Sequence, residues 1–335
     1  MQRPRNLLFG IVRLGLSLIM LAVLVIGGYS AFKHFSGLDP KGLDAKSLIV
    51  NSAWEIIGSV EANQILDSIL SFKIPTSLPS APVTSQEVTN PTPRPGAEII
   101  LRFALVADSH NANPNLTTAL LDAKAKQAKF VIGLGDYTEV GTDSELKAVK
   151  DIFNSVGLPY YLTAGDHDLW NARDKGVSPE AKFNSIFGSP YQSFSDSGVR
   201  FLILYNADNY QGLDEVQMNW LETQVETQVT NPAKLTLAFL HEPLYHPSSD
   251  HFMGRVTPNL KSQAQKINQL LQKGGVKEVF YGDTHFFGRY KEPSTGLRMT
   301  TIGALTAERN AQRPRYSLVE VWNDYQYNVS DIELK

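Results

Sequence analysis

The stretch Phe103-Ala-Leu-Val-Ala-Asp-Ser-His110 is an apolar run that ends abruptly in an aspartate and a histidine. Four further apolar runs end in the same way: 130–134 before Gly135-Asp136, 159–163 before Gly165-Asp-His-Asp168, 235–240 before His241-Glu-Pro243, and 279–281 before Gly282-Asp-Thr-His285. Short apolar runs bounded by turn residues are typical of buried strands. Ligands bind where the carboxyl ends of such strands share one edge of an α/β sheet, so we expect these five polar blocks to converge. A cluster of carboxylates and imidazoles predicts a metal site.

Composition limits the kind of metal site and the kind of partner. The 335 residues contain no cysteine, which excludes disulfides, thiolate zinc sites and cysteine nucleophiles. Any metal must therefore be held by nitrogen and oxygen ligands. The formal net charge of −3 gives no general attraction to polyanions, and we predict no specific binding of nucleic acid.

The first 32 residues differ from the rest of the chain. Residues 7–29 form an apolar stretch that only Arg13 interrupts, and its full length reaches the roughly 20 residues that a helix needs to cross a bilayer. We predict a short cytoplasmic stub and an uncleaved transmembrane anchor within residues 1–32, so that the protein is membrane-anchored by a single pass and its catalytic domain lies outside the cytoplasm. A cleavable signal peptide is the alternative, although Gly27-Gly-Tyr-Ser-Ala-Phe32 lacks a clear cleavage site.

Two regions follow the predicted anchor. Residues 33–96 read as a juxtamembrane helix within 47–71 and then a linker rich in Pro, Ser and Thr. Residues 97–335 alternate strand runs with helical patterns at 115–127, 143–156 and 262–272, which predicts an α/β domain with largely parallel pairing. The runs 299–302, 316–322 and 325–329 follow without helices, and we expect them to form an antiparallel portion. The oligomeric state is left open.

The five polar blocks, taken in order, resemble the signature of the calcineurin-like metallophosphoesterases. Gly135-Asp-Tyr-Thr-Glu-Val-Gly141 is also similar to the Gly-Asp-Tyr-Val-Asp-Arg-Gly run of the protein serine/threonine phosphatases in that superfamily, and Gln217-x-x-Trp220-Leu221 is similar to a segment of its purple-acid-phosphatase-like branch. The resemblance spans roughly residues 100 to 290. It implies that residues 97–335 form a metallophosphoesterase domain, a four-layer sandwich with two sheets.

The resemblance also implies a role for each block. In the family pattern, Asp108, His110 and His285 bind one ion, Asp136 bridges to a second, and Asp166, His241 and Asp283 complete the second site. His167 would contact the phosphate and protonate the leaving oxygen, a general-acid task that histidine side chains commonly perform. Glu139 stands where the family has a carboxylate that orients this histidine. The implied cofactors are two metal ions (Mn, Fe, Zn or Mg), and the implied activity is hydrolysis of a phosphomonoester or phosphodiester of unknown identity.

Two positions depart from the family, and both fall on the second metal. Asp166 stands where the family has Asn, and Asp283 where it has His, so four carboxylates instead of two would face two divalent cations. A harder second ion such as Mn²⁺, Mg²⁺ or Fe³⁺ could restore the fit. Alternatively, His246 or His251 substitutes as a ligand, or the second site is weak. Val140 replaces a phosphate-binding arginine of the protein phosphatases. The competing interpretation is therefore a noncatalytic metal-binding or interaction module with an impaired second metal site.

Overall fold

The computed structural model describes residues 89–335, which form two mixed β-sheets with helices on their outer faces. The first sheet contains five strands: β1 (Ile99–Val106), β2 (Val131–Leu134), β3 (Tyr160–Thr163), β10 (Arg315–Trp322) and β11 (Tyr327–Glu333). Their order across the sheet is β11-β10-β1-β2-β3. The three strands β1, β2 and β3 are parallel, and β10 and β11 are added antiparallel at one side.

The second sheet contains six strands: β4 (Gln192–Asp196), β5 (Val199–Ile203), β6 (Leu235–Phe239), β7 (Glu278–Tyr281), β8 (Gly288–Lys291) and β9 (Arg298–Thr301). Their order is β4-β5-β6-β7-β9-β8. The four central strands are parallel, and the two edge strands, β4 and β8, are antiparallel to their neighbours.

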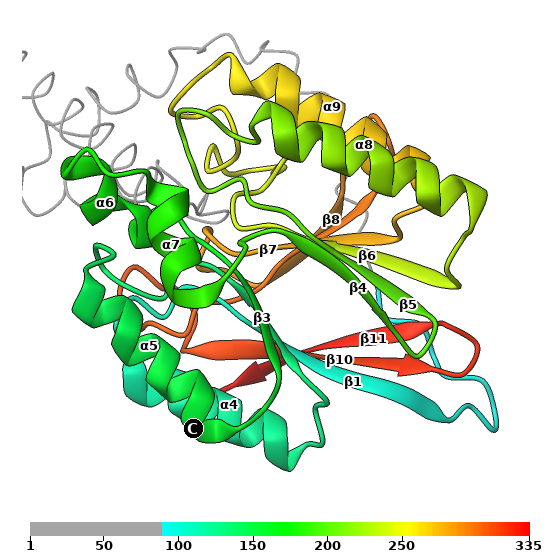
Figure 1. The fold of residues 1–335 in the computed structure, drawn as a ribbon. Helices are drawn as coiled ribbons and strands as arrows, with labels where there is room; N and C mark the ends of the chain where they lie inside the picture. Colours follow the sequence, from blue (N-terminus) through cyan, green and yellow to red (C-terminus); the bar gives the residue numbers. More distant parts are fainter. Residues whose placement is uncertain (1–88) are drawn as a thin grey trace, which may run out of the picture.

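Helices cover the outer face of each sheet, which makes four layers (Figure 1). The helices are α4 (Asn113–Ala125), α5 (Asp143–Val156), the 3₁₀ turn η1 (His167–Leu169), α6 (Trp170–Asp174), α7 (Pro179–Phe187), α8 (Glu215–Thr230) and α9 (Leu260–Lys273). Helices α4 and α5 lie on the first sheet, and α8 and α9 lie on the second.

Successive side chains of a strand point to opposite faces of its sheet. One set is buried between the two sheets, and the other is buried under the helices. In β1, Leu101, Phe103 and Leu105 belong to the core between the sheets, whereas Ala104 and Val106 pack against the helices. The core between the sheets is rich in phenylalanine: the ring of Phe103 lies 5.2 Å from that of Phe201 and 6.1 Å from that of Phe239. Large aromatic side chains bury much apolar area, so this layer holds the two sheets together.

The three helices predicted within residues 97–335 are confirmed, and the predicted antiparallel end is confirmed in part. Helix α5 has the predicted bounds because its signals are local: Thr142 and Glu145 form a capping box, and Gly157 ends the helix in the left-handed conformation. Strands β10 and β11 are antiparallel as expected. The run 299–302 was wrongly expected to join them. It forms most of β9, which pairs in parallel with β7 in the other sheet.

The predicted membrane anchor is not supported. Within residues 89–335, no helix has both the length and the apolar character needed to cross a bilayer. The segments 1–32 and 33–88, where we predicted the anchor, the juxtamembrane helix and most of the linker, lie outside the described residues. We therefore withdraw the prediction of a single-pass membrane-anchored protein whose catalytic domain lies outside the cytoplasm.

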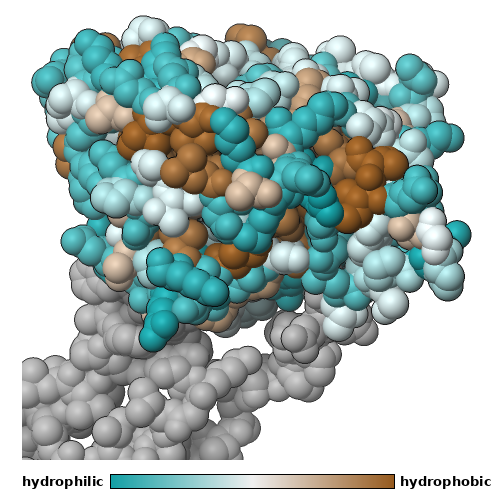
Figure 2. All heavy atoms as spheres, turned by 90° about the horizontal axis from the view of Figure 1, so that it is seen from below, coloured by the Kyte–Doolittle hydropathy of each residue, from teal (hydrophilic) through white to brown (hydrophobic). Residues whose placement is uncertain are grey.

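The side of the molecule that faces down in Figure 1, with α4 and α5, has a mixed surface. Figure 2 shows this side as mainly hydrophilic, with separate hydrophobic patches between polar side chains. Scattered exposed apolar residues such as Leu121 on α4, which is 52% exposed, are ordinary on the surface of a folded domain.

Candidate metal centre

The structure brings all five polar blocks together at one edge of the sandwich. The first sheet supplies Asp108 and His110 after β1, Asp136 after β2, and Asp166 and His167 after β3; the second supplies His241 after β6 and Asp283 and His285 after β7. Ligand atoms of these residues form overlapping groups of three, each within 4.8 Å of one another. All seven predicted ligands belong to at least one group, so the predicted convergence is what the structure shows. Their roles as ligands stay predictions.

Unusual backbone geometry aims these side chains inward. Five of the seven predicted ligands have a positive φ: Asp108 (53°), His110 (40°), Asp136 (55°), Asp283 (63°) and His285 (53°). Left-handed backbone is uncommon outside glycine, and each instance costs roughly 1–3 kcal/mol unless the surroundings hold it in place. Each strand thus ends in a sharp turn that points its polar block at the shared edge.

Two glycines allow the β2 and β3 turns to touch. A Cβ added to Gly135 would lie 2.4 Å from the backbone nitrogen of Gly165. A Cβ added to Gly165 would lie 2.0 Å from Oδ1 of Asp136. The glycines in the Gly-Asp and Gly-Asp-His-Asp blocks are therefore required by close approach of the backbone.

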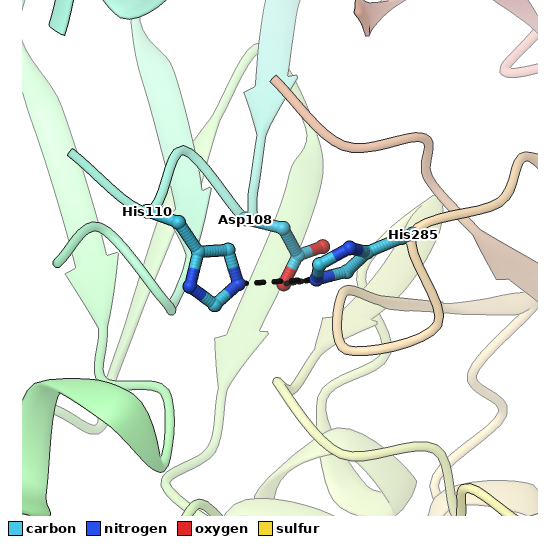
Figure 3. Close-up of side chains that lie close together, drawn as sticks. All are labelled: Asp108, His110 and His285. Carbon is cyan, nitrogen blue, oxygen red and sulfur yellow. Dashed lines mark hydrogen bonds and ion pairs between the residues drawn. The ribbon is translucent and has the colours of Figure 1, made fainter. Parts of the chain in front are cut away.

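The first group consists of Asp108, His110 and His285, whose side chains point toward one another in Figure 3. The two Nε2 atoms of His110 and His285 are 3.1 Å apart, and Nε2 of His285 lies 4.0 Å from Oδ1 of Asp108. Nitrogens about 2.1 Å from one shared ion, at angles of about 90–109°, lie about 3.0–3.4 Å apart. Burial and neighbouring positive charges lower the pKa of His110 to about 2, and burial lowers that of His285 to about 4. Both imidazoles are neutral at pH 7 and have lone pairs to offer.

Asp136 lies between the two halves of the centre. Its Oδ2 is 3.5 Å from Nε2 of His110, and its Oδ1 is 3.5 Å from Nε2 of His241. The backbone N–H of His167 also donates to Oδ1, at 3.0 Å. A carboxylate with one oxygen toward each half has the placement that a bridging ligand needs.

The second group consists of Asp166, His241 and Asp283. Nδ1 of His241 donates to the main-chain oxygen of Leu134 at 2.7 Å, because a carbonyl can only accept. Nε2 of His241 therefore faces Asp166, whose Oδ1 is 3.7 Å away. On the other side of Asp283, Nδ1 of His251 lies 3.9 Å from Oδ1. His246 lies elsewhere: its Nδ1 accepts the backbone N–H groups of Ser248 and Ser249.

Two buried atoms that could bind a metal ion have no hydrogen-bond partner in the described part of the chain, and this fits a metal site. Asp108 Oδ2 and His241 Nε2 are buried and make no hydrogen bond to any residue that the structure describes. Leaving such atoms unpaired costs roughly 1–3 kcal/mol each, so a native site retains them for a ligand. Oxygen and nitrogen donors of this kind suit Mn²⁺, Fe, Zn²⁺ or Mg²⁺.

His167 lies beside this cluster and is held from two sides. Its Nδ1 donates to the main-chain oxygen of Glu139 at 2.7 Å, so Nε2 takes no part in that bond. The ring of Trp170 stacks on that of His167, with centroids 3.8 Å apart and planes at 29°. We expected the carboxylate of Glu139 to orient His167. The hydrogen bond to His167 is accepted by the backbone oxygen of Glu139, while the carboxylate lies 3.7 Å from Nδ1 of His110 and within 4.8 Å of a ring nitrogen of His167, so its role stays a prediction.

Several residues of the site were not predicted from sequence. Asn209 donates to Oδ2 of Asp166 at 2.9 Å, and Asn206 accepts the backbone N–H groups of His241 and Glu242. Both follow β5, whose end resembles the other strand ends, and this was the one available signal. Trp170 and Arg309 carried no pattern. Asp168 and Asp208 have structural roles: Asp168 accepts from Thr138 and Gly165, and Asp208 from the backbone of the following turn.

The sequence and the fold are similar to those of known proteins. Residues 101–287 match the family model described as calcineurin-like phosphoesterase. A segment of 170 residues is 28% identical to a protein of Arcobacter nitrofigilis named probable glycerophosphodiester phosphodiesterase GpdQ, and covers 50% of this chain and 59% of that relative. A purple acid phosphatase from yellow lupin seeds has a similar fold, with a TM-score of 0.53 at 16% identity, over 72% of this chain and 53% of the other.

The family match covers more than half of the chain and contains all the polar blocks. The two sheets and the strand-end cluster agree with it. The chain therefore belongs to the calcineurin-like phosphoesterase family, a family of hydrolases that act on phosphoester bonds.

Proposed function

We propose that the protein hydrolyses a phosphoester with the help of two divalent metal ions. The observation that carries this proposal is the position of Asp136, which has one oxygen toward His110 of the first group and the other toward His241 of the second. Asp108, His110 and His285 would hold one ion, and Asp166, His241 and Asp283 the other. A pair of such ions supplies charge neutralisation of the phosphoryl oxygens and acidification of water.

The protein's own side chains would orient the ester and move the proton. His167 has its Nδ1 fixed on the carbonyl of Glu139, so Nε2 is the atom left to protonate the departing oxygen. Trp170 keeps the imidazole plane in place from one side and is 37% exposed at the mouth of the site. Asn209 orients Asp166 through a hydrogen bond of 2.9 Å.

The second site favours a hard cation. Asp166 and Asp283 are carboxylates, and Mn²⁺ and Mg²⁺ prefer oxygen ligands. We propose Mn²⁺ as the ion to test first. Because the relative from Arcobacter is named a probable glycerophosphodiester phosphodiesterase, we propose a phosphodiester as the first substrate class, with monoesters as the comparison.

The test measures metal content and hydrolysis together. The purified full-length chain is loaded with Mn²⁺, its metal is quantified, and turnover is followed on bis(4-nitrophenyl) phosphate and 4-nitrophenyl phosphate. We expect two ions per chain and turnover that Asp136→Asn abolishes. Asp196→Asn is the matched control, because Asp196 pairs with Lys129 on the surface away from the site. One ion or none, with no turnover on either ester, would favour the noncatalytic metal-binding or interaction module.

The proposed proton-donor role of His167 can be tested by comparing esters with different leaving groups. A nitrophenol leaves readily as an anion, whereas an alcohol needs a proton as it leaves. His167→Ala should therefore slow hydrolysis of glycerophosphodiesters by a larger factor than hydrolysis of nitrophenyl esters. Equal losses on both kinds of ester would contradict the proton-donor role.

A further inference from the structure

A loop that belongs to none of the five polar blocks crosses the metal centre. This loop, residues 302–314, joins β9 of the second sheet to β10 of the first. The backbone N–H of Leu305 donates to the oxygen of Ala107 at 3.1 Å, and that of Thr306 donates to the oxygen of Asp108 at 2.9 Å. The loop is thus fixed to the strand end that carries the first predicted ligand.

The tip of the loop is held in one conformation. The side-chain amide of Asn310 donates to the oxygens of Ala304 and Thr306, at 3.3 and 2.8 Å. Gln312 accepts the backbone N–H of Phe287, which ties the loop to the segment after β7. Arg309, at the tip, has a φ of 51°. An arginine kept in left-handed backbone costs stability, and such residues gather at functional sites.

The side chain of Arg309 reaches the metal centre from solvent. Its Nη2 lies 3.8 Å from Oε2 of Glu139, and the other oxygen of Glu139 lies 3.7 Å from Nδ1 of His110. A separation of 3.8 Å is an ion pair and not a hydrogen bond, so the guanidinium N–H groups are not committed to Glu139. The side chain is 45% exposed. Burial lowers the pKa of His110 and of His285, and the positive charge of Arg309 lowers both further.

The charge of the proposed centre explains why a positive side chain beside it would help to bind phosphate. Four carboxylates among the seven ligands cancel the charge of two divalent ions, so the loaded centre would attract an anionic phosphate weakly. Val140 stands where the protein phosphatases have a phosphate-binding arginine, and it offers no charge. The guanidinium of Arg309, held at the mouth of the site by the 302–314 loop, would supply the positive charge that the neutral metal centre lacks. It would also replace the arginine that is absent at position 140.

We propose that Arg309 binds a non-bridging phosphoryl oxygen of the substrate. The planar guanidinium presents paired N–H donors that match phosphate oxygens, and such charge-assisted hydrogen bonds are stronger than neutral ones. Arg309 is then a specificity-determining residue supplied by the 302–314 loop. This inference rests on the proposed hydrolysis of a phosphoester.

The experiment measures phosphate binding apart from catalysis. Inorganic phosphate is titrated calorimetrically into the full-length, Mn²⁺-loaded protein and into Arg309→Met and Arg309→Lys. We expect Arg309→Met to lower the affinity for phosphate about tenfold or more, which corresponds to about 1.4 kcal/mol or more, and to raise KM for a nitrophenyl ester with a smaller change in kcat. Arg309→Lys should recover part of the affinity, because it keeps the charge and loses the paired donors.

Arg313→Met is the matched control. Arg313 belongs to the same loop and carries the same charge, but it is 81% exposed and pairs with Glu333. The Arg313→Met variant should bind phosphate with the affinity of the unmodified protein. Unchanged phosphate affinity in Arg309→Met, or an equal loss in both variants, would overturn the inference. So would a loss of bound Mn²⁺ in Arg309→Met alone, since Arg309 would then act through the metal ligands.

The two proposals fail in different ways. If the unmodified protein binds two ions and turns over esters, while Arg309→Met behaves identically, the role of Arg309 fails and the proposed function stands. If the unmodified protein neither hydrolyses esters nor binds phosphate, both fail.

Discussion

His241 Nδ1 and the main-chain oxygen of Leu134 are 2.7 Å apart, and this hydrogen bond joins the two sheets. Leu134 ends β2 of the first sheet, and His241 follows β6 of the second. The bond fixes the imidazole so that Nε2 points at Asp136 and Asp166. A contact between the layers therefore also sets the geometry of the proposed second metal site.

The first prediction separates these two roles of His241. In His241→Asn the side-chain amide is short but retains an N–H near the position of Nδ1, while the atom in the position of Nε2 is lost. We expect the affinity for the more weakly bound Mn²⁺ to fall at least tenfold, with a smaller effect on the first ion. Calorimetric titration of Mn²⁺ measures both affinities. Two unchanged binding steps would show that His241 is not a ligand.

Metal binding should release protons, and its affinity should rise with pH. Burial raises the pKa of Asp108 to about 7. Burial lowers the pKa of His241, but Asp136 and Asp166 outweigh burial and hold that pKa well above its ordinary value. Below about pH 7 both groups carry protons that a cation must displace, so affinity decreases as pH falls. His110 and His285, whose pKa values are lowered to about 2 and about 4, contribute no proton at pH 6.

The measurement for this prediction is titration of Mn²⁺ at pH 6 in buffers of different ionisation enthalpy. The slope of the observed enthalpy gives the number of protons released. Asp108→Asn should release fewer protons than the unmodified protein, because it has no carboxyl proton at that position. A slope of zero for the unmodified protein would contradict the prediction.

His251 should support the second metal site through Asp283. Nδ1 of His251 is 3.9 Å from Oδ1 of Asp283, and His251 holds the pKa of Asp283 below its ordinary value against the effect of burial. Residues that orient a ligand typically contribute a factor of about 10–100 to metal affinity. We expect His251→Ala to weaken the second Mn²⁺ by a factor in that range, measured by titration.

His246→Ala is the control for that variant. His246 lies five residues earlier in the same loop, but its Nδ1 accepts backbone N–H groups and its ring packs 4.9 Å from that of Tyr290. Its replacement should lower thermal stability and leave both metal affinities in place. Equal metal affinities in the two variants would remove His251 from the site.

Gly165→Ala should damage the fold and the metal centre together. The new Cβ would lie 2.0 Å from Oδ1 of Asp136, a contact that the buried β2 turn cannot relieve without moving Asp136. Overpacking of this kind typically costs about 1–3 kcal/mol. Urea denaturation should show a loss of that size or larger, together with lower Mn²⁺ content. Gly288→Ala, whose Cβ would meet its nearest atom at 3.5 Å, should remain close to the unmodified protein in both measurements.

The parts of the fold that local signals specify could be predicted from the sequence. The capping box at Thr142 and the left-handed Gly157 define α5, and the apolar runs before each polar block define the parallel strands. Because the carboxyl ends of such strands share one edge of a sheet, the sequence also predicted that Asp108, Asp136 and His241 lie together, although they are far apart in the chain. These predictions held because the signal for each lies within a few residues of the element itself.

Long-range choices could not be predicted in this way. Residues 299–302 have a strand pattern whether they pair with β7 or with β10, and only the packed layers decide between the sheets. The stacking of Trp170 on His167 and the approach of Arg309 to Glu139 depend on where loops cross. Likewise, the sequence did not predict that the backbone oxygen of Glu139 accepts the hydrogen bond from Nδ1 of His167, because this contact depends on the path of the chain.

The division of the ligands between the two sheets constrains how this protein can change. Asp108, Asp136 and Asp166 move with one sheet, while His241, Asp283 and His285 move with the other. Any mutation that slides or tilts one layer against the other would also alter the spacing of the proposed metal ions. New substrate preferences are therefore expected to arise through loops such as 302–314, while the angle between the layers stays constant across functional variants.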